Sequence, residues 1–587
     1  MTGVRSFHLD TLDTALPQDY DQDYNCLPQV PGTRNLVYAI TLPVMNDVKS
    51  DTQRSVLIKV EDIGSYEVPT GSNLRETLRR EGVYIDGTCS DNGTCGRCVV
   101  RVTHGDAREP SLQETGLLGE RSADHEHRLA CRVTVNGDLD ISIDRERMLE
   151  VDATGRWKEV WGSPLWRPDL ISPDRNGYGV AVDLGTTSIV AGLFDMSNAR
   201  PLDIKASANP HLPWGEDIIS RLDSANAGVD VVTRLKELIW KTVGDQVRSL
   251  CLRSGVSGGR ITRMVVVGNS AVHHLSLGLP TDSLLTPPYS PSERSPMVLP
   301  ASELPISMQL GHETVIYFPP LAGGYAGSDA LASLFAARET GVKKGALVDV
   351  GTNTEIAVWN GDKIILATAP SGPAFEGGHI RSGMRAEEGA VWRVEIKDGD
   401  FLHEVIGEGP VKGVCGTGIV DAIAAMLRCG IVDHTGLMVE GSHPLVKGGR
   451  FVFRDANVDA KEDENNVALE GEDVATVQKA KAAIAATLQL LLKVMGMEYR
   501  DLERVYLAGA FGSRLNLANA VRIGLLPELS LDHYVLSGNT ALLGASMILL
   551  SEKAQLETER IGRMATHHSV AEDQDFEELF IDNLYFT

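Results

Sequence analysis

The chain has 587 residues, of which 43% are hydrophobic and 23% are charged, so it can bury large cores. Its formal net charge of −25 argues against nucleic acid or an anionic membrane surface as the main partner. No run of about 18 apolar residues occurs and no signal peptide is visible, so we expect a cytoplasmic protein without a membrane span. At about 150 residues per domain, the length allows roughly four domains.

Residues 1–53 show little hydrophobic periodicity and carry five aspartates between Asp10 and Asp23, which predicts a mobile N-terminal extension. A first folded unit is expected over residues 54–145. Val56, Ile58 and Val60 alternate with polar residues as in a strand, and the segment 73–80 can form a short helix.

Four cysteines dominate this unit: Cys89-x5-Cys95-x2-Cys98 and, after 32 further residues, Cys131. Three of them lie in a loop with glycines at 87, 93 and 96, which let the backbone turn tightly around a bound group. Thiolates grouped three and one can hold a [2Fe–2S] cluster. Disulfides would suit a secreted chain, and zinc ribbons pair two Cys-x2-Cys knuckles where this chain has one. Cys26, Cys251, Cys415 and Cys429 lack ligand spacing and are expected to be thiols.

The cysteine loop resembles that of the plant and adrenodoxin type of [2Fe–2S] ferredoxin, although the first gap is five residues and the plant pattern has four. The resemblance implies a β-grasp fold for residues 54–145. A linker follows over 146–177, and its tryptophans Trp157, Trp161 and Trp166 favour a segment docked on the next domain.

An internal repeat then sets the architecture. Residues 181–191 and 347–357 align with an offset of 166, and each reads as an apolar strand, an aspartate, a Gly-Thr turn and a second strand. Two copies of one hairpin predict two similar halves, which we place at 178–344 and 345–568, with a C-terminal tail over 569–587. Backbone amides and hydroxyls in such turns can hold phosphates, and the aspartates can hold Mg²⁺. A third glycine-rich element at 509–512 follows a strand and permits close approach of an adenosine.

These three motifs resemble the phosphate-1, phosphate-2 and adenosine motifs of the ASKHA superfamily (actin, Hsp70 and sugar kinases). The resemblance implies two RNase H-like α/β halves that clamp ATP. It implies that Asp183 and Asp349 are catalytic residues that organise Mg²⁺. The implied nucleotide-binding residues are Gly185, Thr186, Thr187, Gly351, Thr352, Asn353, Gly509, Ala510, Phe511 and Gly512.

The order of motifs over residues 55–550 is similar to that of the reductive activators of corrinoid proteins. The chain lacks the C-terminal cysteines of the archaeal methylamine-system activators, which carry two [4Fe–4S] clusters. The resemblance implies that an electron from the [2Fe–2S] cluster reduces inactive Co(II) to Co(I), with ATP, in a methyltransferase system such as an O-demethylase. It also implies an upstream low-potential electron donor and leaves open whether the chain forms a homodimer. The alternatives are an activator of another low-potential enzyme, such as a 2-hydroxyacyl-CoA dehydratase, and a nucleotide-binding redox sensor.

The loop 371–380 follows the second hairpin and is rich in glycine and proline. We expect it to report the nucleotide state to the partner, with Phe375 as a contact and the Ser371 hydroxyl as a third catalytic group near cobalt. The alternative for Ser371 is a structural turn. His273 and His274 are interpreted as structural residues.

Overall fold

The computed structural model describes most of the chain from residue 55 onward. The described residues are 55–61, 64–81, 83, 85, 98–105, 107, 109–118, 126–143, 160–163, 165–166, 175–215, 217–226, 228–306, 310–311, 313–397, 400–407, 410–453, 467–512 and 514–587. The predicted N-terminal extension, Cys26, Cys89, Cys95 and Trp157 lie outside these residues. No helix within the described ranges has both the length and the apolar composition of a membrane span.

The N-terminal domain is built on a five-stranded sheet in the order β2-β1-β5-β3-β4. Val56, Ile58 and Val60 of β1 point into the core, as their alternation predicts. β1 pairs antiparallel with β2 and parallel with β5, which gives the mixed sheet expected of a β-grasp fold. Its elements are β1 (Ser55–Val60), β2 (Gly64–Pro69), α1 (Leu74–Arg80), β3 (Val99–His104), α2 (Leu112–Leu118), β4 (His127–Leu129) and β5 (Leu139–Ile143).

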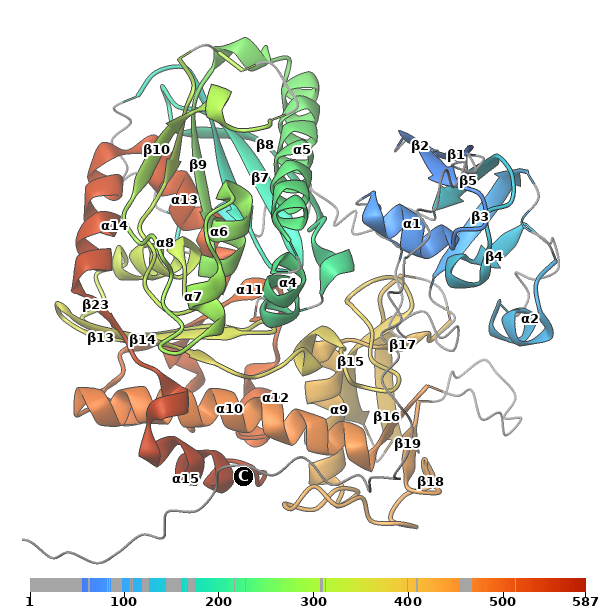
Figure 1. The fold of residues 1–587 in the computed structure, drawn as a ribbon. Helices are drawn as coiled ribbons and strands as arrows, with labels where there is room; N and C mark the ends of the chain where they lie inside the picture. Colours follow the sequence, from blue (N-terminus) through green and yellow to red (C-terminus); the bar gives the residue numbers. More distant parts are fainter. Residues whose placement is uncertain are drawn as a thin grey trace, which may run out of the picture. The chain divides into compact units, whose positions relative to one another are not determined.

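The first half of the remaining chain has a six-stranded sheet in the order β10-β11-β9-β6-β7-β8. β6 and β7 form the predicted first hairpin, and β6 also pairs with β9 in parallel. The strands are β6 (Tyr178–Leu184), β7 (Ser188–Asp195), β8 (Arg200–Ala208), β9 (Ile261–Gly268), β10 (Met297–Pro300) and β11 (Val315–Phe318). The helices are α4 (Ile218–Ala225), α5 (Val229–Ser254), α6 (Ser270–Leu277), α7 (Asp282–Leu285) and α8 (Ser328–Arg338) (Figure 1).

The second half repeats this arrangement in the sheet order β22-β21-β12-β13-β14-β23. β12 and β13 form the second hairpin, and β21 pairs with β12 in parallel just as β9 pairs with β6. The elements of this sheet are β12 (Lys344–Asp349), β13 (Thr354–Asn360), β14 (Lys363–Ala369), β21 (Arg504–Ala508), β22 (Tyr534–Gly538) and β23 (Ala565–His567). The shared order β9-β6-β7-β8 and β21-β12-β13-β14 is the structural basis of the sequence repeat, and it confirms the predicted fold class.

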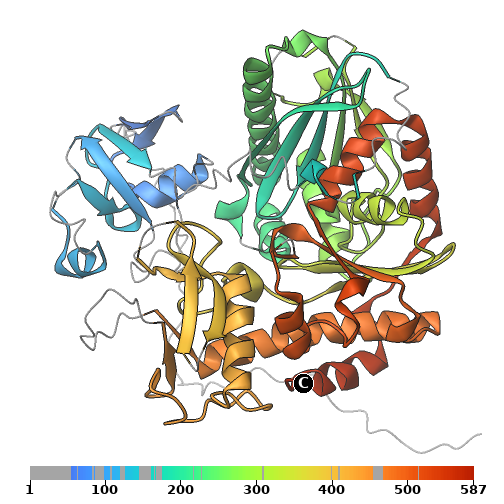
Figure 2. The same cartoon turned by 180° about the vertical axis from the view of Figure 1, so that it is seen from behind.

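Further elements of the second half surround this sheet. Its helices are α9 (Gly416–Arg428), α10 (Gly471–Met495), α11 (Gly509–Gly512), α12 (Leu517–Arg522), α13 (Thr540–Leu550) and α14 (Glu552–Met564). Two small sheets are formed by β15 (Ala390–Lys397), β16 (Asp400–Val405) and β17 (Gly413–Val414), and by β18 (Val446–Lys447), β19 (Arg450–Val452) and β20 (Ala468–Glu470). Figure 2 shows α10 beneath the second sheet from the reverse side.

A common hydrophobic core joins the two halves. It contains Ala181 and Val265 of the first sheet and Leu347 and Ala357 of the second, together with the inner faces of α8 and α13. α13 packs so closely on α8 that a Cβ added at Gly544 would lie 2.1 Å from the Ala332 carbonyl oxygen. This shared core places the two hairpins next to each other.

The described part of the linker is docked on the first half. Trp161 is buried and meets the Phe194 ring edge-on, with the ring centroids 5.0 Å apart.

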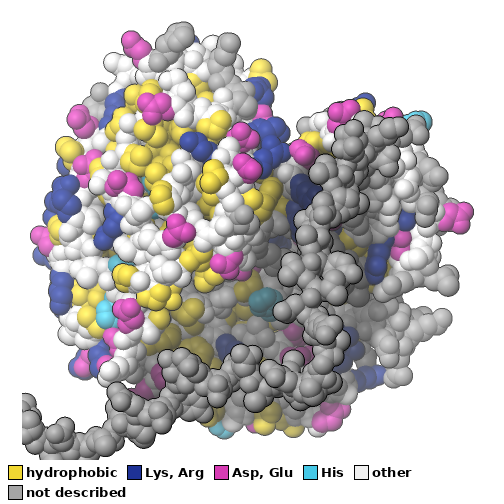
Figure 3. All heavy atoms as spheres, in the orientation of Figure 1, with side chains coloured by type: hydrophobic (Ala, Val, Ile, Leu, Met, Phe, Trp, Pro, Cys, Tyr) yellow, Lys and Arg dark blue, Asp and Glu magenta, His cyan; other side chains and the backbone are white. Residues whose placement is uncertain are grey.

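On the described surface in the view of Figure 3, acidic side chains lie interspersed with basic ones.

The predicted C-terminal tail is corrected by the structure. Residues 574–582 form α15 (Gln574–Asp582), and the residues after it pack on α10. Phe586 is buried, and the Gln478 side chain donates a hydrogen bond to the Leu584 carbonyl at 3.0 Å. The segment is short and acidic, so its sequence favours a tail. The apolar Phe576, Leu579 and Phe586 nevertheless anchor it on the core of the second half.

Candidate functional site

The two aspartates of the repeat lie close enough for their charges to interact. Asp183 lies near the end of β6 and Asp349 is the last residue of β12. Burial, and next the Asp183 charge, raise the pKa of Asp349 to about 7. Asn539, at the N-terminus of α13, donates a hydrogen bond to Asp183 Oδ2 at 2.8 Å and so fixes its orientation.

Two further carboxyl groups join this pair, and the sequence analysis missed both. Burial, followed by the charges of Asp183 and Asp349, raises the pKa of Asp329 in α8 to about 8. Glu355 in β13 has its pKa raised by burial and then by Asp329 and Asp349. The sequence carries one weak signal for Asp329, an acidic residue in the first turn of a helix. Nothing in the local pattern distinguishes Glu355.

Asp183, Asp329, Asp349 and Glu355 form a cluster of buried carboxyl groups whose charges interact. No three Cys, His, Asp or Glu side chains of the described residues converge as a complete metal-binding set. Mg²⁺ at nucleotide sites needs only one or two protein carboxylates, because phosphates and waters complete its shell, so Asp183 and Asp349 could hold it without such a set. Burial raises these pKa values most and mutual repulsion adds to it, and a bound cation would relieve the repulsion.

The turn of the first hairpin is held from behind by two asparagines. Asn209 donates its side-chain amide to the Gly185 carbonyl at 2.7 Å and its backbone N–H to the Thr187 carbonyl at 2.9 Å. Asn269 donates to Thr186 Oγ1 at 3.0 Å. The turn is therefore preorganised by the strands and helices around it. Neither asparagine was singled out from the sequence.

A buried histidine supports Asn209. His211 is fully buried, its backbone N–H donates to Asn209 Oδ1, and Nε2 lies 2.8 Å from the Leu235 carbonyl. Nδ1 has no hydrogen-bond partner among the described residues. Burial, and to a lesser extent the Arg221 charge, lower the pKa of His211 to about 3 against its ordinary 6.5.

The lowered pKa of His211 makes the free energy of unfolding depend on pH. Because unfolded His211 binds a proton below about pH 6.5 and folded His211 does not, stability present above pH 6.5 is lost as the pH falls. We expect a loss of roughly 2–3 kcal/mol by about pH 4.5 from this residue. Urea unfolding of the wild type and of His211→Gln at both pH values measures it, since glutamine can donate to Leu235 but does not titrate. His104→Gln, at an exposed position at the end of β3, is the control. Equal pH dependence in wild type and His211→Gln would contradict the assignment.

The adenosine motif lies beside the second hairpin. Gly509 has φ +82°, and a Cβ there would lie 2.9 Å from Asp349 Oδ1 and from the Val350 carbonyl, so glycine is required. Gly509 to Gly512 form α11. Phe511 stacks on Phe375, with ring centroids 4.9 Å apart and the planes at 27°. The side chain of Ala510 lies outside the described atoms.

The loop 371–380 is placed differently from the expectation. Ser371 is buried, and its hydroxyl donates to the Gly351 carbonyl at 3.1 Å and lies 2.8 Å from Thr354 Oγ1. It therefore braces the second hairpin, whose turn contains Gly351, Thr352 and Asn353, and this supports the structural alternative. The expectation that Phe375 contacts a partner is wrong, because its ring is 3% exposed and packs on Phe511.

In the N-terminal domain, Cys98 and Cys131 lie together. Their sulfur atoms are 3.3 Å apart, the two residues are buried, and the Ala130 N–H donates to the Cys98 carbonyl at 2.7 Å. Asn73 caps α1 and also donates to the Cys131 carbonyl at 2.8 Å. Two adjacent sulfurs from distant parts of the chain fit ligands of a shared iron. The other two predicted ligands lie in the undescribed segment 86–97.

A buried ion pair supports the segment before Cys131. Arg128 Nε donates to Glu114 Oε1 at 2.9 Å, and the Leu129 N–H donates to the same oxygen at 2.7 Å. Both charged side chains are at most 3% exposed. Paired in this way, they fix the strand that leads to the cysteine. The sequence motif Arg128-Leu-Ala-Cys131 gave no indication of this partner.

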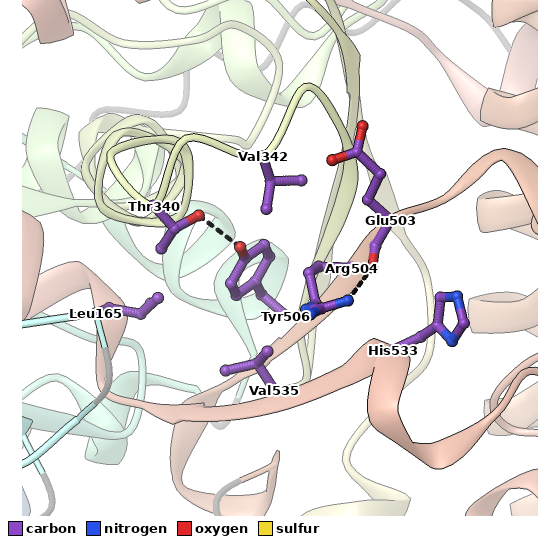
Figure 4. Close-up of a pocket in the computed structure, with 8 residues that line it drawn as sticks. All are labelled: Leu165, Thr340, Val342, Glu503, Arg504, Tyr506, His533 and Val535. Carbon is purple, nitrogen blue, oxygen red and sulfur yellow. Dashed lines mark hydrogen bonds between the residues drawn. The ribbon is translucent and has the colours of Figure 1, made fainter.

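The remaining polar candidates are structural. His273 and His274 are buried in α6, and burial lowers the pKa of both. A separate pocket, shown in Figure 4, is lined by Thr340, Arg504, Tyr506 and His533 among others. It lies at the start of β21, at the opposite end of that strand from the predicted adenosine motif, and is therefore distinct from the candidate nucleotide site.

Comparison with known families matches three stretches of the chain. Residues 344–587 match the family described as the C-terminal domain of RACo, the ASKHA domain, and residues 178–339 match the RACo middle region. Residues 59–136 match the 2Fe-2S iron-sulfur cluster binding domain. The boundaries between these matches fall close to those of the two sheets and the N-terminal domain.

Individual relatives agree with the family matches. The corrinoid activation enzyme RamQ of Eubacterium limosum is 33% identical over 419 residues, which cover 70% of each chain. The [Co(II) methylated amine-specific corrinoid protein] reductase of Methanosarcina barkeri is 27% identical over 446 residues, covering 70% of this chain and 77% of the relative. Among solved structures, a reductive activator for corrinoid, iron-sulfur protein superposes with a TM-score of 0.62 and 25% identity over 90% of this chain and 98% of its own.

Proposed function

The chain belongs to the RACo family of corrinoid activators, and from that premise we propose how its sites divide the work of activation. It is an ATP-dependent iron–sulfur enzyme that reductively activates a corrinoid protein, taking Co(II) to Co(I). The observation that carries this function is the presence in one chain of an adjacent cysteine pair, Cys98 and Cys131, and of facing nucleotide hairpins around Asp183 and Asp349.

The cysteines provide the electron-transfer part. Cys98 and Cys131, with Cys89 and Cys95 from the neighbouring loop, would hold a [2Fe–2S] cluster, which supplies one electron at a time. Plant-type clusters have potentials near about −400 mV, and a one-electron step loses a factor of ten in equilibrium for each ~59 mV uphill. A cobalt couple below the cluster potential would therefore need coupling to a second source of free energy.

The hairpins provide that coupling. Asp183 and Asp349 would hold Mg²⁺ beside the phosphates of ATP, while the turn residues Thr186, Thr187 and Thr352 present hydroxyls and amides to them. The two hairpins belong to different sheets, so a nucleotide bound by both favours one arrangement of the halves. A ligand shifts a conformational equilibrium by its difference in affinity for the two states, and this difference can drive the reduction.

The partner is a corrinoid protein, and we propose that it belongs to a methyltransferase system such as an O-demethylase. A low-potential donor in the same reducing cytoplasm would return the cluster to its reduced state. The rival activator of a 2-hydroxyacyl-CoA dehydratase finds no support among the relatives above, which are named for corrinoid proteins. A redox sensor without turnover would lack ATPase activity stimulated by the corrinoid protein.

We expect ATP, Mg²⁺ and a low-potential reductant together to convert the Co(II) corrinoid protein to Co(I). Without ATP the conversion should stop, although the cluster stays reduced, because the uphill electron transfer is then uncoupled. The absorption spectra of the corrinoid and of the cluster report the two steps separately. ADP in place of ATP is the matched control. Equal rates of cobalt reduction with and without nucleotide would leave only a ferredoxin-like role.

A further inference from the structure

One carboxylate connects the two phosphate hairpins. Glu376 ends the short 3₁₀ turn Ala374–Glu376 in the loop 371–380. Its Oε2 accepts a hydrogen bond from the Thr187 hydroxyl at 3.3 Å, and its Oε1 accepts one from the Thr352 hydroxyl at 3.0 Å. Thr187 belongs to the turn of the first sheet and Thr352 to that of the second, so a single side chain bridges the two halves.

In this contact the Glu376 carboxylate takes the place that a phosphate group could take. A carboxylate presents two anionic oxygens to hydroxyl donors, as a terminal phosphate group does. Both donors are turn residues of the hairpins that bind phosphate in the proposed function. Both printed donors to Glu376 are neutral hydroxyls, which do not neutralise a carboxylate. A phosphate arriving at the same donors would meet both an occupied site and a like charge.

The loop around Glu376 is anchored on both sides. Phe375 stacks on Phe511 of the adenosine motif. Gly377 follows with φ +80°, and a Cβ there would lie 2.5 Å from the backbone N and O atoms of Met384. Ser371 at the start of the loop is hydrogen bonded to the second hairpin. A displaced carboxylate would therefore shift a loop that contacts all three nucleotide motifs.

We propose that Glu376 makes the chain discriminate ATP from ADP, because it competes for the hydroxyl donors that the terminal phosphate of ATP would take. ATP displaces the carboxylate from Thr187 and Thr352, whereas ADP lacks the group that competes for them. The displacement transmits the nucleotide state to the loop 371–380. This inference rests on the proposed function, since it requires that the hairpins bind ATP.

The test compares nucleotide affinities of the wild type and Glu376→Ala. With the competing anion removed, the Kd for the non-hydrolysable analogue AMP-PNP with Mg²⁺ should fall about tenfold, while the Kd for ADP should change by less than about twofold. Glu376→Gln, which removes the charge and keeps the size, should tighten AMP-PNP binding by a smaller factor. Isothermal titration measures all of these values. A misfolded variant cannot produce a gain in affinity.

Glu388→Ala is the matched control, because it removes an exposed acidic side chain from the same region of the sequence. Weaker AMP-PNP binding by Glu376→Ala would show that Glu376 positions the metal or phosphate and would overturn the proposal. Unchanged affinities, or equal tightening for ADP and AMP-PNP, would overturn it as well. A wild-type chain that binds neither nucleotide would instead refute the proposed function.

Discussion

Asp183→Asn should lower ATP turnover by about 10²–10³-fold, the range seen when one preorganised electrostatic group is removed from an active site. The substitution removes a negative charge beside the proposed Mg²⁺. It keeps the shape of the side chain. It also keeps an oxygen that can accept the hydrogen bond which Asn539 donates to Asp183 Oδ2 at 2.8 Å in the wild type. The fold of the first hairpin should therefore survive, and the absorption of the iron–sulfur cluster should not change.

Steady-state ATPase assays at saturating and at limiting Mg²⁺ measure this effect and separate metal binding from chemistry. Asp195→Asn is the matched control. Asp195 lies at the far end of β7 from the turn, where its carboxylate accepts hydrogen bonds from Ser197. A fully active Asp183→Asn chain would mean that the first hairpin is wrongly assigned, whatever the behaviour of the second.

The main architecture could be predicted because it repeats. The 166-residue offset between Asp183 and Asp349 corresponds to two hairpins with the same place in two similar sheets. The cysteine pattern was equally informative, since Cys98 and Cys131 are far apart in sequence and adjacent in the structure. In both cases the spacing of residues along the chain pointed to the arrangement, so no knowledge of tertiary packing was required.

Other parts of the site depend on packing and could not be found in this way. Asp329 and Glu355 come from α8 and β13, and their raised pKa values arise only because the shared core brings these elements to Asp183 and Asp349. Phe375 was misplaced for the same reason. A phenylalanine in a loop rich in glycine and proline reads as a surface contact until Phe511, more than 130 residues later, is found stacked upon it.

Cys131→Ser should abolish the visible absorption of the [2Fe–2S] cluster and the reduction of cobalt, while ATP binding is retained. Serine replaces a thiolate ligand by a poorer one in a buried position, next to Cys98 and held by Asn73. ATP binding should survive because the nucleotide motifs belong to β6, β12 and β21, which lie in sheets separate from that of the cysteines.

Iron and sulfide analysis of anaerobically purified protein measures the loss of the cluster. Nucleotide titration measures whether ATP binding is retained. Cys429→Ser is the control, because Cys429 is exposed, follows directly after α9 and has no place in the cysteine pattern. The wild type should contain two irons per chain and the Cys429→Ser variant the same number. Zinc in place of iron, four irons per chain, or an unchanged spectrum in Cys131→Ser would each exclude a [2Fe–2S] cluster at these ligands. Loss of ATP binding in Cys131→Ser would show instead that the two sites depend on each other for folding.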